Sequence, residues 1–223
     1  MSAAVNRSPD DAAADLIVVA KEPVPGRVKT RLTPAYTPGE AAALAEASLR
    51  DTLAAVAAAA AGRRVLVLDG VPGRWLPRGF TVLAQRGGGL DERLAGAFGG
   101  AYRGRPLVLI GMDTPQVTPA LLNDASRSLA RHDAVFGPAS DGGFWLLGLR
   151  RPDAALLRGV PMSRPDTGAV QLARLRAAGL DVAALPELTD VDTAADAERV
   201  AAGAAGTRFA AAVRALGART ATA

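Results

Sequence analysis

Short apolar runs alternate with longer segments of helical pattern along most of the chain. The runs at 16–20 (LIVVA), 65–68 (VLVL) and 107–110 (LVLI) are apolar at every position, which is typical of strands buried on both faces of a sheet. Further strands are predicted at 80–84, 134–136, 144–149 and 180–185. Helices are predicted at about 37–61, 90–102, 168–178 and 193–202, after Thr118-Pro119, and from Gly206 onward.

This alternation of strands and helices predicts an α/β fold, a single domain of three α/β/α layers around a mostly parallel (mixed) twisted sheet. The domain is expected to span 15–204. A disordered tail is expected at 1–14, and a C-terminal helix with a frayed end at 205–223. Ligands of such sheets bind at the carboxyl ends of the strands. The residues that directly follow strands are therefore the candidates for function.

Composition narrows the chemistry that the chain can perform. Its 223 residues contain no cysteine and one histidine, His132, which we expect at the surface. Thiol nucleophiles, cysteine-ligated metals and two-histidine metal sites are excluded. The net charge is only +4 and aromatic residues make up 4%, so a nucleic-acid partner is not expected. No apolar run is long enough for a membrane span. We therefore expect a cytoplasmic protein, and the sequence leaves a homodimer open.

A cationic segment follows the first predicted strand. Lys21, Arg27, Lys29 and Arg31 lie within eleven residues, in a loop shaped by proline and by Gly26. Backbone amides together with Lys and Arg side chains are what a polyphosphate requires, although a solvated basic loop would have the same composition. Neither a Walker loop nor a G-x-G-x-x-G fingerprint is present.

Acidic residues occur at two later points. Asp113 directly follows the most apolar predicted strand, where it could bind Mg²⁺ or cap the turn before a proline. Asp190 and Asp192 lie on the same side of an extended segment that runs into a helix, and Asp192 could instead serve as a local cap. Two carboxylates on one face repel each other unless a cation lies between them, and this favours a metal site.

Two glycine-rich loops complete the set of candidates. Gln85 begins a loop with glycines at 87–89, where a flat ring could approach the backbone and the amide of Gln85 could meet a base edge. The second loop joins two strands and contains Asp141-Gly142-Gly143, an ordinary turn sequence.

Five stretches of the chain together resemble the nucleotide-diphospho-sugar transferase (GT-A-like) superfamily. They are AKEPVPGRVKTRL, the Gln85 glycine loop, GMDTP, GPASDGGFWLLGL and DVDT. The chain is most similar to a bacterial family of small glycosyltransferase-like proteins. This family is related to 2-phospho-lactate guanylyltransferase and, more distantly, to molybdenum-cofactor guanylyltransferases and sugar-phosphate nucleotidylyltransferases. The resemblance covers about residues 15–202. The Gly-Gly-x-Gly-Thr-Arg loop of the sugar-phosphate enzymes is not present.

The resemblance implies a role for each candidate. Nucleotide binding is implied for Lys21, Gly26, Arg27, Lys29, Arg31, Gln85 and Gly88, and metal binding for Asp113, Asp190 and Asp192. Acceptor binding is implied for Asp141, Gly142, Gly143, Ser163 and Thr167. The groups expected to act in catalysis are Lys29, Arg31, Asp113 and Asp141. The implied cofactor is Mg²⁺ or Mn²⁺, and the implied partners are a nucleoside triphosphate or nucleotide-sugar and a small-molecule acceptor.

Among the activities that the resemblance implies, we expect nucleotidyl transfer from a nucleoside triphosphate to a phosphorylated small molecule, with release of pyrophosphate, and this chemistry suits the composition. A phosphate nucleophile is already ionised near neutral pH, so the lack of cysteine and the single histidine are no handicap. One alternative is a GT-A glycosyltransferase that uses a nucleotide-sugar donor, with Asp141 as its base. A second alternative is a non-catalytic nucleotide-binding protein.

Overall fold

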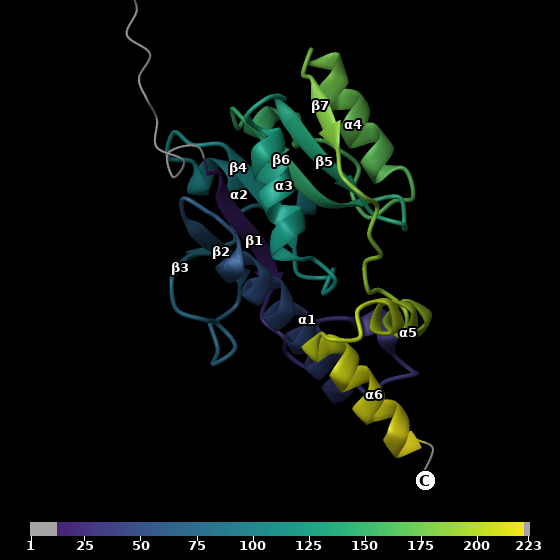
Figure 1. The fold of residues 1–223 in the computed structure, drawn as a ribbon. Helices are drawn as coiled ribbons and strands as arrows, with labels where there is room; N and C mark the ends of the chain where they lie inside the picture. The colour runs from purple at the N-terminus through teal and green to yellow at the C-terminus, as the bar shows by residue number, and fades with distance from the viewer. Residues whose placement is uncertain (1–12, 221–223) are drawn as a thin grey trace, which may run out of the picture.

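The computed structural model describes residues 13–220, which fold around one seven-stranded sheet (Figure 1). In sheet order the strands are β3, β2, β1, β4, β6, β5 and β7. Their bounds are β1 Asp15–Lys21, β2 Arg64–Asp69, β3 Phe80–Ala84, β4 Leu107–Gly111, β5 Ala134–Pro138, β6 Phe144–Leu149 and β7 Val182–Ala184. Strand β1 pairs in parallel with β2 and β4, and β2 pairs in parallel with β3. Strand β6 runs antiparallel to both of its neighbours, so the predicted mostly parallel mixed sheet is confirmed.

In this described part of the chain, six α-helices and two 3-10 helices accompany the strands, and three of the α-helices begin where the sequence places a cap. Thr37 and Glu40 form a capping box at the start of α1, and Thr193 and Asp196 form another at the start of α5. Thr118 caps α3 through its side chain. The bounds are η2 Thr30–Leu32, α1 Pro38–Ala58, α2 Leu90–Ala101, α3 Pro119–Ser128, η3 Ala154–Leu156, α4 Thr167–Ala177, α5 Ala194–Gly203 and α6 Arg208–Thr220.

The central strands β1, β2, β4, β5 and β6 are largely buried, with apolar clusters on both faces of the sheet, as the three predicted layers require. Side chains alternate along β1, so that Leu16 and Val18 join one apolar cluster while Ile17 and Val19 join another. The first cluster includes residues of α1 and α3, and the second includes residues of α2 and α4. The predicted α/β/α arrangement is thereby confirmed.

A third apolar cluster lies outside these layers, where α5 and α6 pack beside α1 (Figure 1). Phe209 of α6 is 1% exposed there. Leu44 of α1 and Val200 of α5 are buried in the same cluster. The carboxylate of Asp51 on α1 accepts hydrogen bonds from the backbone N–H groups of Arg208 and Phe209 at the start of α6. The C-terminal helix is thus docked onto the body of the fold.

The predicted tails lie mostly outside the described residues, namely at 1–12 and 221–223. Ala14, which the sequence assigns to the tail, is fully buried, so the apolar core begins one residue before the predicted domain. Within residues 13–220, no helix is long and apolar enough to cross a membrane.

Candidate active site

The carboxyl ends of β1 and β4 meet the segment that precedes α5. Strands β1 and β4 are parallel neighbours, so the loops that follow them leave the sheet at the same edge. The N–H of Val191 donates to the carbonyl oxygen of Asp113 over 2.9 Å. This backbone bond joins the two acidic segments, which lie far apart in the sequence.

Lys29 links these acidic segments through its side chain. Its Nζ lies 2.8 Å from Oδ1 of Asp113 and 3.2 Å from Oδ1 of Asp192. The two carboxylate oxygens are therefore no farther apart than those two distances together. The exposed side chain of Arg31 places its Nη1 3.0 Å from Oδ2, the other carboxylate oxygen of Asp192. Four charged residues predicted for the site are thus linked by direct contacts.

The side chain of Lys29 is only 7% exposed, which is unusual for a lysine. Burial by itself lowers the pKa of its ammonium, but the negative charges of Asp113 and Asp192 outweigh burial and raise the pKa above its ordinary value. The backbone of Lys29 is left-handed, with φ 49° and ψ 38°. For a residue other than glycine such a conformation costs about 1–3 kcal/mol and is often found at functional sites.

Asp190 is the most perturbed carboxyl group of the site. Its pKa is raised to about 7, mainly by burial and further by the charges of Asp113, Asp141 and Asp192, while Lys29 opposes the rise. The four carboxyl groups therefore lie within electrostatic reach of one another. A carboxyl group surrounded by like charges favours either a proton or a nearby cation.

The donor set suits a hard divalent cation, because Mg²⁺ prefers carboxylate oxygens and completes its shell with water and substrate phosphates. Within residues 13–220, however, no group of three acidic or histidine side chains is arranged to hold a metal ion by itself. Lys29 lies between two of the three predicted ligands. The residues fit a cation that also takes ligands from a substrate.

The rest of the cationic segment faces solvent. Lys21, Gly26 and Arg27 are exposed, and Gly26 has the positive φ of 76° that its turn requires. The N–H of Lys21 contacts Sδ of Met112 at 3.2 Å, which places the segment against the residue before Asp113. The predicted phosphate loop thus has exposed cationic side chains beside one that is turned inward.

The Gln85 loop, which is predicted to contact the nucleotide base, lies at the same edge of the sheet. Polar groups of Gln85 and Gly88 already form hydrogen bonds within the protein. Nε2 of Gln85 donates to the carbonyl oxygens of Ala20 (2.7 Å) and Val67 (3.3 Å). Both amide hydrogens therefore face the main chain, and the amide oxygen is the part of Gln85 that can meet a base. The N–H of Gly88 donates to Glu92 over 2.7 Å. This contact must open before Gly88 can bind a ligand through its N–H.

The predicted acceptor residues lie on two touching segments. The N–H of Gly168 donates to the carbonyl oxygen of Gly142 over 2.7 Å, and a Cβ at Gly142 would lie 1.9 Å from the carbonyl oxygen of Pro165. Asp141 is exposed, and its Oδ1 accepts from the N–H of Gly143. Only glycine at position 142 allows this close packing.

The two hydroxyl side chains predicted for the acceptor site differ. Ser163 is exposed and has a left-handed backbone, with φ 58°. Thr167 is buried, and its hydroxyl donates to the carbonyl oxygen of Pro161 while accepting from the N–H of Arg164. In the structure, therefore, Thr167 holds its own loop together, and the acceptor contact implied for it stays a prediction.

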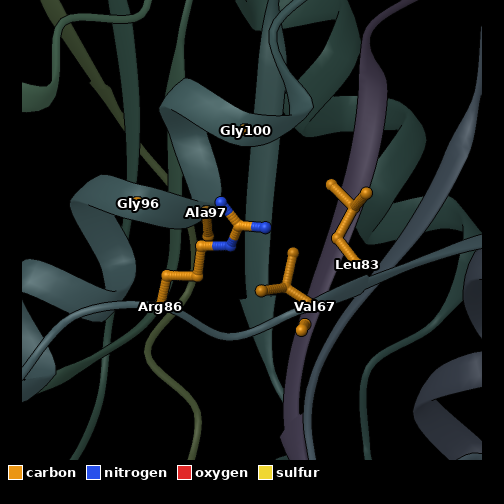
Figure 2. Close-up of a pocket in the computed structure, with 7 residues that line it drawn as sticks. Val67, Leu83, Arg86, Gly96, Ala97 and Gly100 are labelled. Atoms are coloured by element: carbon orange, nitrogen blue, oxygen red, sulfur yellow. The ribbon is translucent and has the colours of Figure 1, made fainter.

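A cavity of about 250 Å³ lies between β2, β3 and α2 (Figure 2). Its walls are mostly apolar, and the two glycines of α2 among them carry no side chain that would fill it. The lining residues are Val67, Leu83, Ala84, Arg86, Gly96, Ala97 and Gly100. Figure 2 shows the side chain of Arg86 reaching toward α2. The cavity adjoins the Gln85 loop, and none of the acidic residues of the site lines it.

The structure adds two supporting residues that the sequence analysis missed. Ser48 of α1 is buried and donates to the carbonyl oxygen of Met112 over 2.6 Å, next to Asp113. Phe209 of α6 lines a small space together with Lys29 and Val191. An isolated serine or phenylalanine in an apolar helix carries no signal of such a role, because the contact depends on the tertiary packing of distant segments.

Comparison with known proteins shows the family. Residues 41–164 match the model of DUF2064, described as an uncharacterized protein conserved in bacteria. The chain belongs to this family. It is also 35% identical, over 82% of its length and 88% of the relative's, to 3-phospho-D-glycerate guanylyltransferase of Phenylobacterium zucineum (strain HLK1). The expected relationship to guanylyltransferases is confirmed, as is the expected transferase class.

Solved structures agree with this assignment to the DUF2064 family. A protein from Desulfovibrio desulfuricans G20, assigned to the nucleotide-diphospho-sugar transferases, superposes with a TM-score of 0.72 at 30% identity, covering 81% of this chain and 82% of the other. The 2-C-methyl-D-erythritol 4-phosphate cytidylyltransferase of Thermus thermophilus superposes with a TM-score of 0.55 at 18% identity, covering 86% and 98%. The first match confirms the predicted GT-A-like fold, and the second shares the fold alone.

Proposed function

We propose that this DUF2064 protein transfers a nucleotidyl group from a nucleoside triphosphate to a phosphorylated small molecule and releases pyrophosphate. The observation that carries the proposal is the contact of Lys29 with Asp113 and Asp192 at the carboxyl edge of the sheet. The guanylyltransferase relative supports it and suggests GTP as donor and a phosphoglycerate-like acceptor. Both substrates are polyanions, and the exposed Lys21 and Arg27 lie on the same loop as Lys29.

In the proposed reaction, an oxygen of the acceptor phosphate attacks the α-phosphorus of the nucleotide. A new phosphorus–oxygen bond forms as the bond from the α-phosphorus to the bridging oxygen breaks, and that oxygen leaves with the pyrophosphate. The nucleophile is already an anion, so no side chain needs to remove a proton. The protein must instead position the two substrates in line and stabilise the negative charge that builds on the phosphates.

The charged residues divide this work between them. Lys21, Arg27, Lys29 and Arg31 would contact the phosphates, and Asp113, Asp190 and Asp192 would hold Mg²⁺ or Mn²⁺. When bound, the divalent cation would offset negative charge on the phosphate oxygens. The oxygen of Gln85 and the N–H of Gly88 would meet the base. Asp141, Gly142, Gly143 and Ser163 would face the acceptor, with Thr167 holding their loop.

A thermal-shift panel tests the donor class directly. The protein is melted with Mg²⁺ and each of GTP, ATP, CTP, UTP and a set of nucleotide-sugars. A bound ligand at one hundred times its Kd stabilises the native state by about 2.7 kcal/mol. We expect a nucleoside triphosphate to raise the Tm more than any nucleotide-sugar does. Greater stabilisation by a nucleotide-sugar would reject the proposal.

The Desulfovibrio match favours sugar transfer from a nucleotide-sugar as a second candidate. An inverting enzyme of that kind needs a carboxylate base at the acceptor, and Asp141 is exposed beside the acceptor loop. Asp141→Asn separates the two candidates. Transfer to a hydroxyl would be abolished by this change, whereas attack by a phosphate would survive in part.

A further inference from the structure

We propose that Lys29 is an internal counter-ion that keeps the divalent cation out of the site until a triphosphate chain draws its ammonium away. The cation would then enter together with the nucleotide and not before it. This inference rests on the proposed function, because it concerns the order in which the two components of that same site bind.

The position of the ammonium is the first argument. A single Nζ contacts Asp113 at 2.8 Å and Asp192 at 3.2 Å, and these two carboxylates come from segments far apart in the sequence. A Mg²⁺ ion would need oxygens of the same carboxylates at about 2.0–2.1 Å. The ammonium and the cation would therefore occupy overlapping places, and their positive charges would repel each other.

The charge of the site is the second argument. Lys29 and Arg31 together balance Asp113 and Asp192. With these pairs formed, a free cation would have to displace the Lys29 ammonium before it could bind these oxygens of Asp113 and Asp192. Without Lys29, two carboxylate oxygens would face each other across a short gap, and a divalent cation would be the most favourable partner for them.

The surroundings of Lys29 are the third argument, because they allow its ammonium to exchange partners. Lys29 has a left-handed backbone and immediately precedes the short helix η2, while Gly26 and Arg27, separated from it by the buried Val28, are exposed. A triphosphate bound beside Arg27 would offer phosphate oxygens to the Lys29 ammonium. The carboxylates released by this exchange would then be free for the cation, which would also take phosphate oxygens as ligands.

The test measures Mn²⁺ binding by water-proton relaxation, without any assay of activity. Wild-type protein is titrated with Mn²⁺ alone and then with inorganic tripolyphosphate added. We expect weak binding of Mn²⁺ alone and a protein-bound signal once tripolyphosphate is present. Lys29→Met should bind Mn²⁺ alone at least about ten-fold more tightly than wild type, because it leaves the carboxylates without their counter-ion. Lys29→Gln serves as a second neutral variant in case the first does not fold, as judged by circular dichroism.

Three controls tie the effect to this contact. Lys29→Arg keeps the positive charge and should still exclude Mn²⁺. Lys29→Met combined with Asp113→Asn should lose the gained affinity. Arg151→Met removes an exposed cation that follows β6. Strand β6 runs antiparallel to β4, so it ends at the opposite edge of the sheet from Asp113. This change should not alter Mn²⁺ binding.

Equal Mn²⁺ affinity of wild type and the neutral Lys29 variants would overturn the inference, and so would a gain that survives Asp113→Asn. Failure of the proposed function has a different signature. In that case no nucleoside triphosphate would release pyrophosphate with any acceptor, while the Mn²⁺ titrations would still report whether Lys29 excludes the cation.

Discussion

The segment that matches the DUF2064 model and the two segments that flank it contribute differently to the molecule. Residues 41–164 form strands β2 to β6 and supply Asp113. The flanks supply Lys29, Arg31, Asp190 and Asp192, together with α5 and α6. The matched segment thus supplies Asp113 and most of the residues proposed for the base and the acceptor, whereas the flanks supply strand β1 and the charged side chains that gather around Asp113.

The largest expected effect tests whether the C-terminal flank is part of one cooperative unit. Phe209→Ala removes a side chain that is 1% exposed beside Lys29, and such truncations cost about 3–5 kcal/mol of unfolding free energy. Urea unfolding measures this cost. Ala211→Ser, at an exposed position of the same helix, should cost less than about 0.5 kcal/mol. Equal stability of both variants would show that α6 does not support the fold.

Asp113→Asn tests the charge that the matched segment brings to the site. Loss of a preorganised electrostatic group costs about 3–4 kcal/mol of transition-state stabilisation, which is more than about a hundred-fold in kcat/KM. The Tm is measured alongside, because Asp113 also pairs with the buried ammonium of Lys29 and a loss of folding must be separated from a loss of activity. Asp124→Asn on the surface of α3 is the control and should keep full activity. If Asp113→Asn retained full activity, Asp113 would have no role in the reaction.

Asp51→Ala tests the connection between the two regions. Asp51 lies on α1 within the matched segment and accepts two backbone hydrogen bonds and an Arg208 side-chain contact from α6. A hydrogen bond to a charged group contributes about 1.5–3 kcal/mol, so we expect unfolding in urea to show a loss of at least that size. Glu46→Ala, which removes an exposed ion pair with Arg50 on the same helix, should change stability by less than about 1 kcal/mol. A loss at Asp51 no larger than the loss at Glu46 would contradict the docking role.

Because the pKa of Asp190 is raised in the folded protein, we expect the free energy of unfolding to depend on pH. Its pKa is raised to about 7 in the folded protein, so the native state keeps a proton that the unfolded chain loses near pH 4. The native state should therefore lose stability as the pH rises from about 4 to 7. Asp190→Asn removes this contribution, and urea unfolding across that range should show a smaller decline. An unchanged decline would mean that another group is responsible.

Local patterns predicted most of the fold, because the elements carry their own signals. Strands β3 and β6 have the predicted bounds, and the capping boxes at Thr37 and Thr193 begin α1 and α5 as expected. The docking of α6 was not predicted. It depends on the contact between Asp51 and Phe209, which lie far apart in the sequence.

The sequence predicts a set of candidate site residues, but it does not predict the contacts between them. The position of Asp113 after a strand and the same-face spacing of Asp190 and Asp192 favour a metal site, and the structure brings Asp113 and Asp192 onto one lysine. Sequence could not show that Lys29 turns inward while Arg27 stays exposed, because the loop backbone determines this. Nor could it show that the amide hydrogens of Gln85 are bound to β1 and β2.

The most direct test of nucleotidyl transfer follows the α-phosphate itself. The protein is incubated with Mg²⁺, GTP labelled at the α-phosphate and 3-phosphoglycerate, and both pyrophosphate and labelled acceptor are measured. We expect label to appear on the acceptor in equal amount to the pyrophosphate released, and Asp113→Asn to lower both together. Pyrophosphate release without label on any phosphorylated acceptor, or label transfer unaffected by Asp113→Asn, would contradict the proposed function.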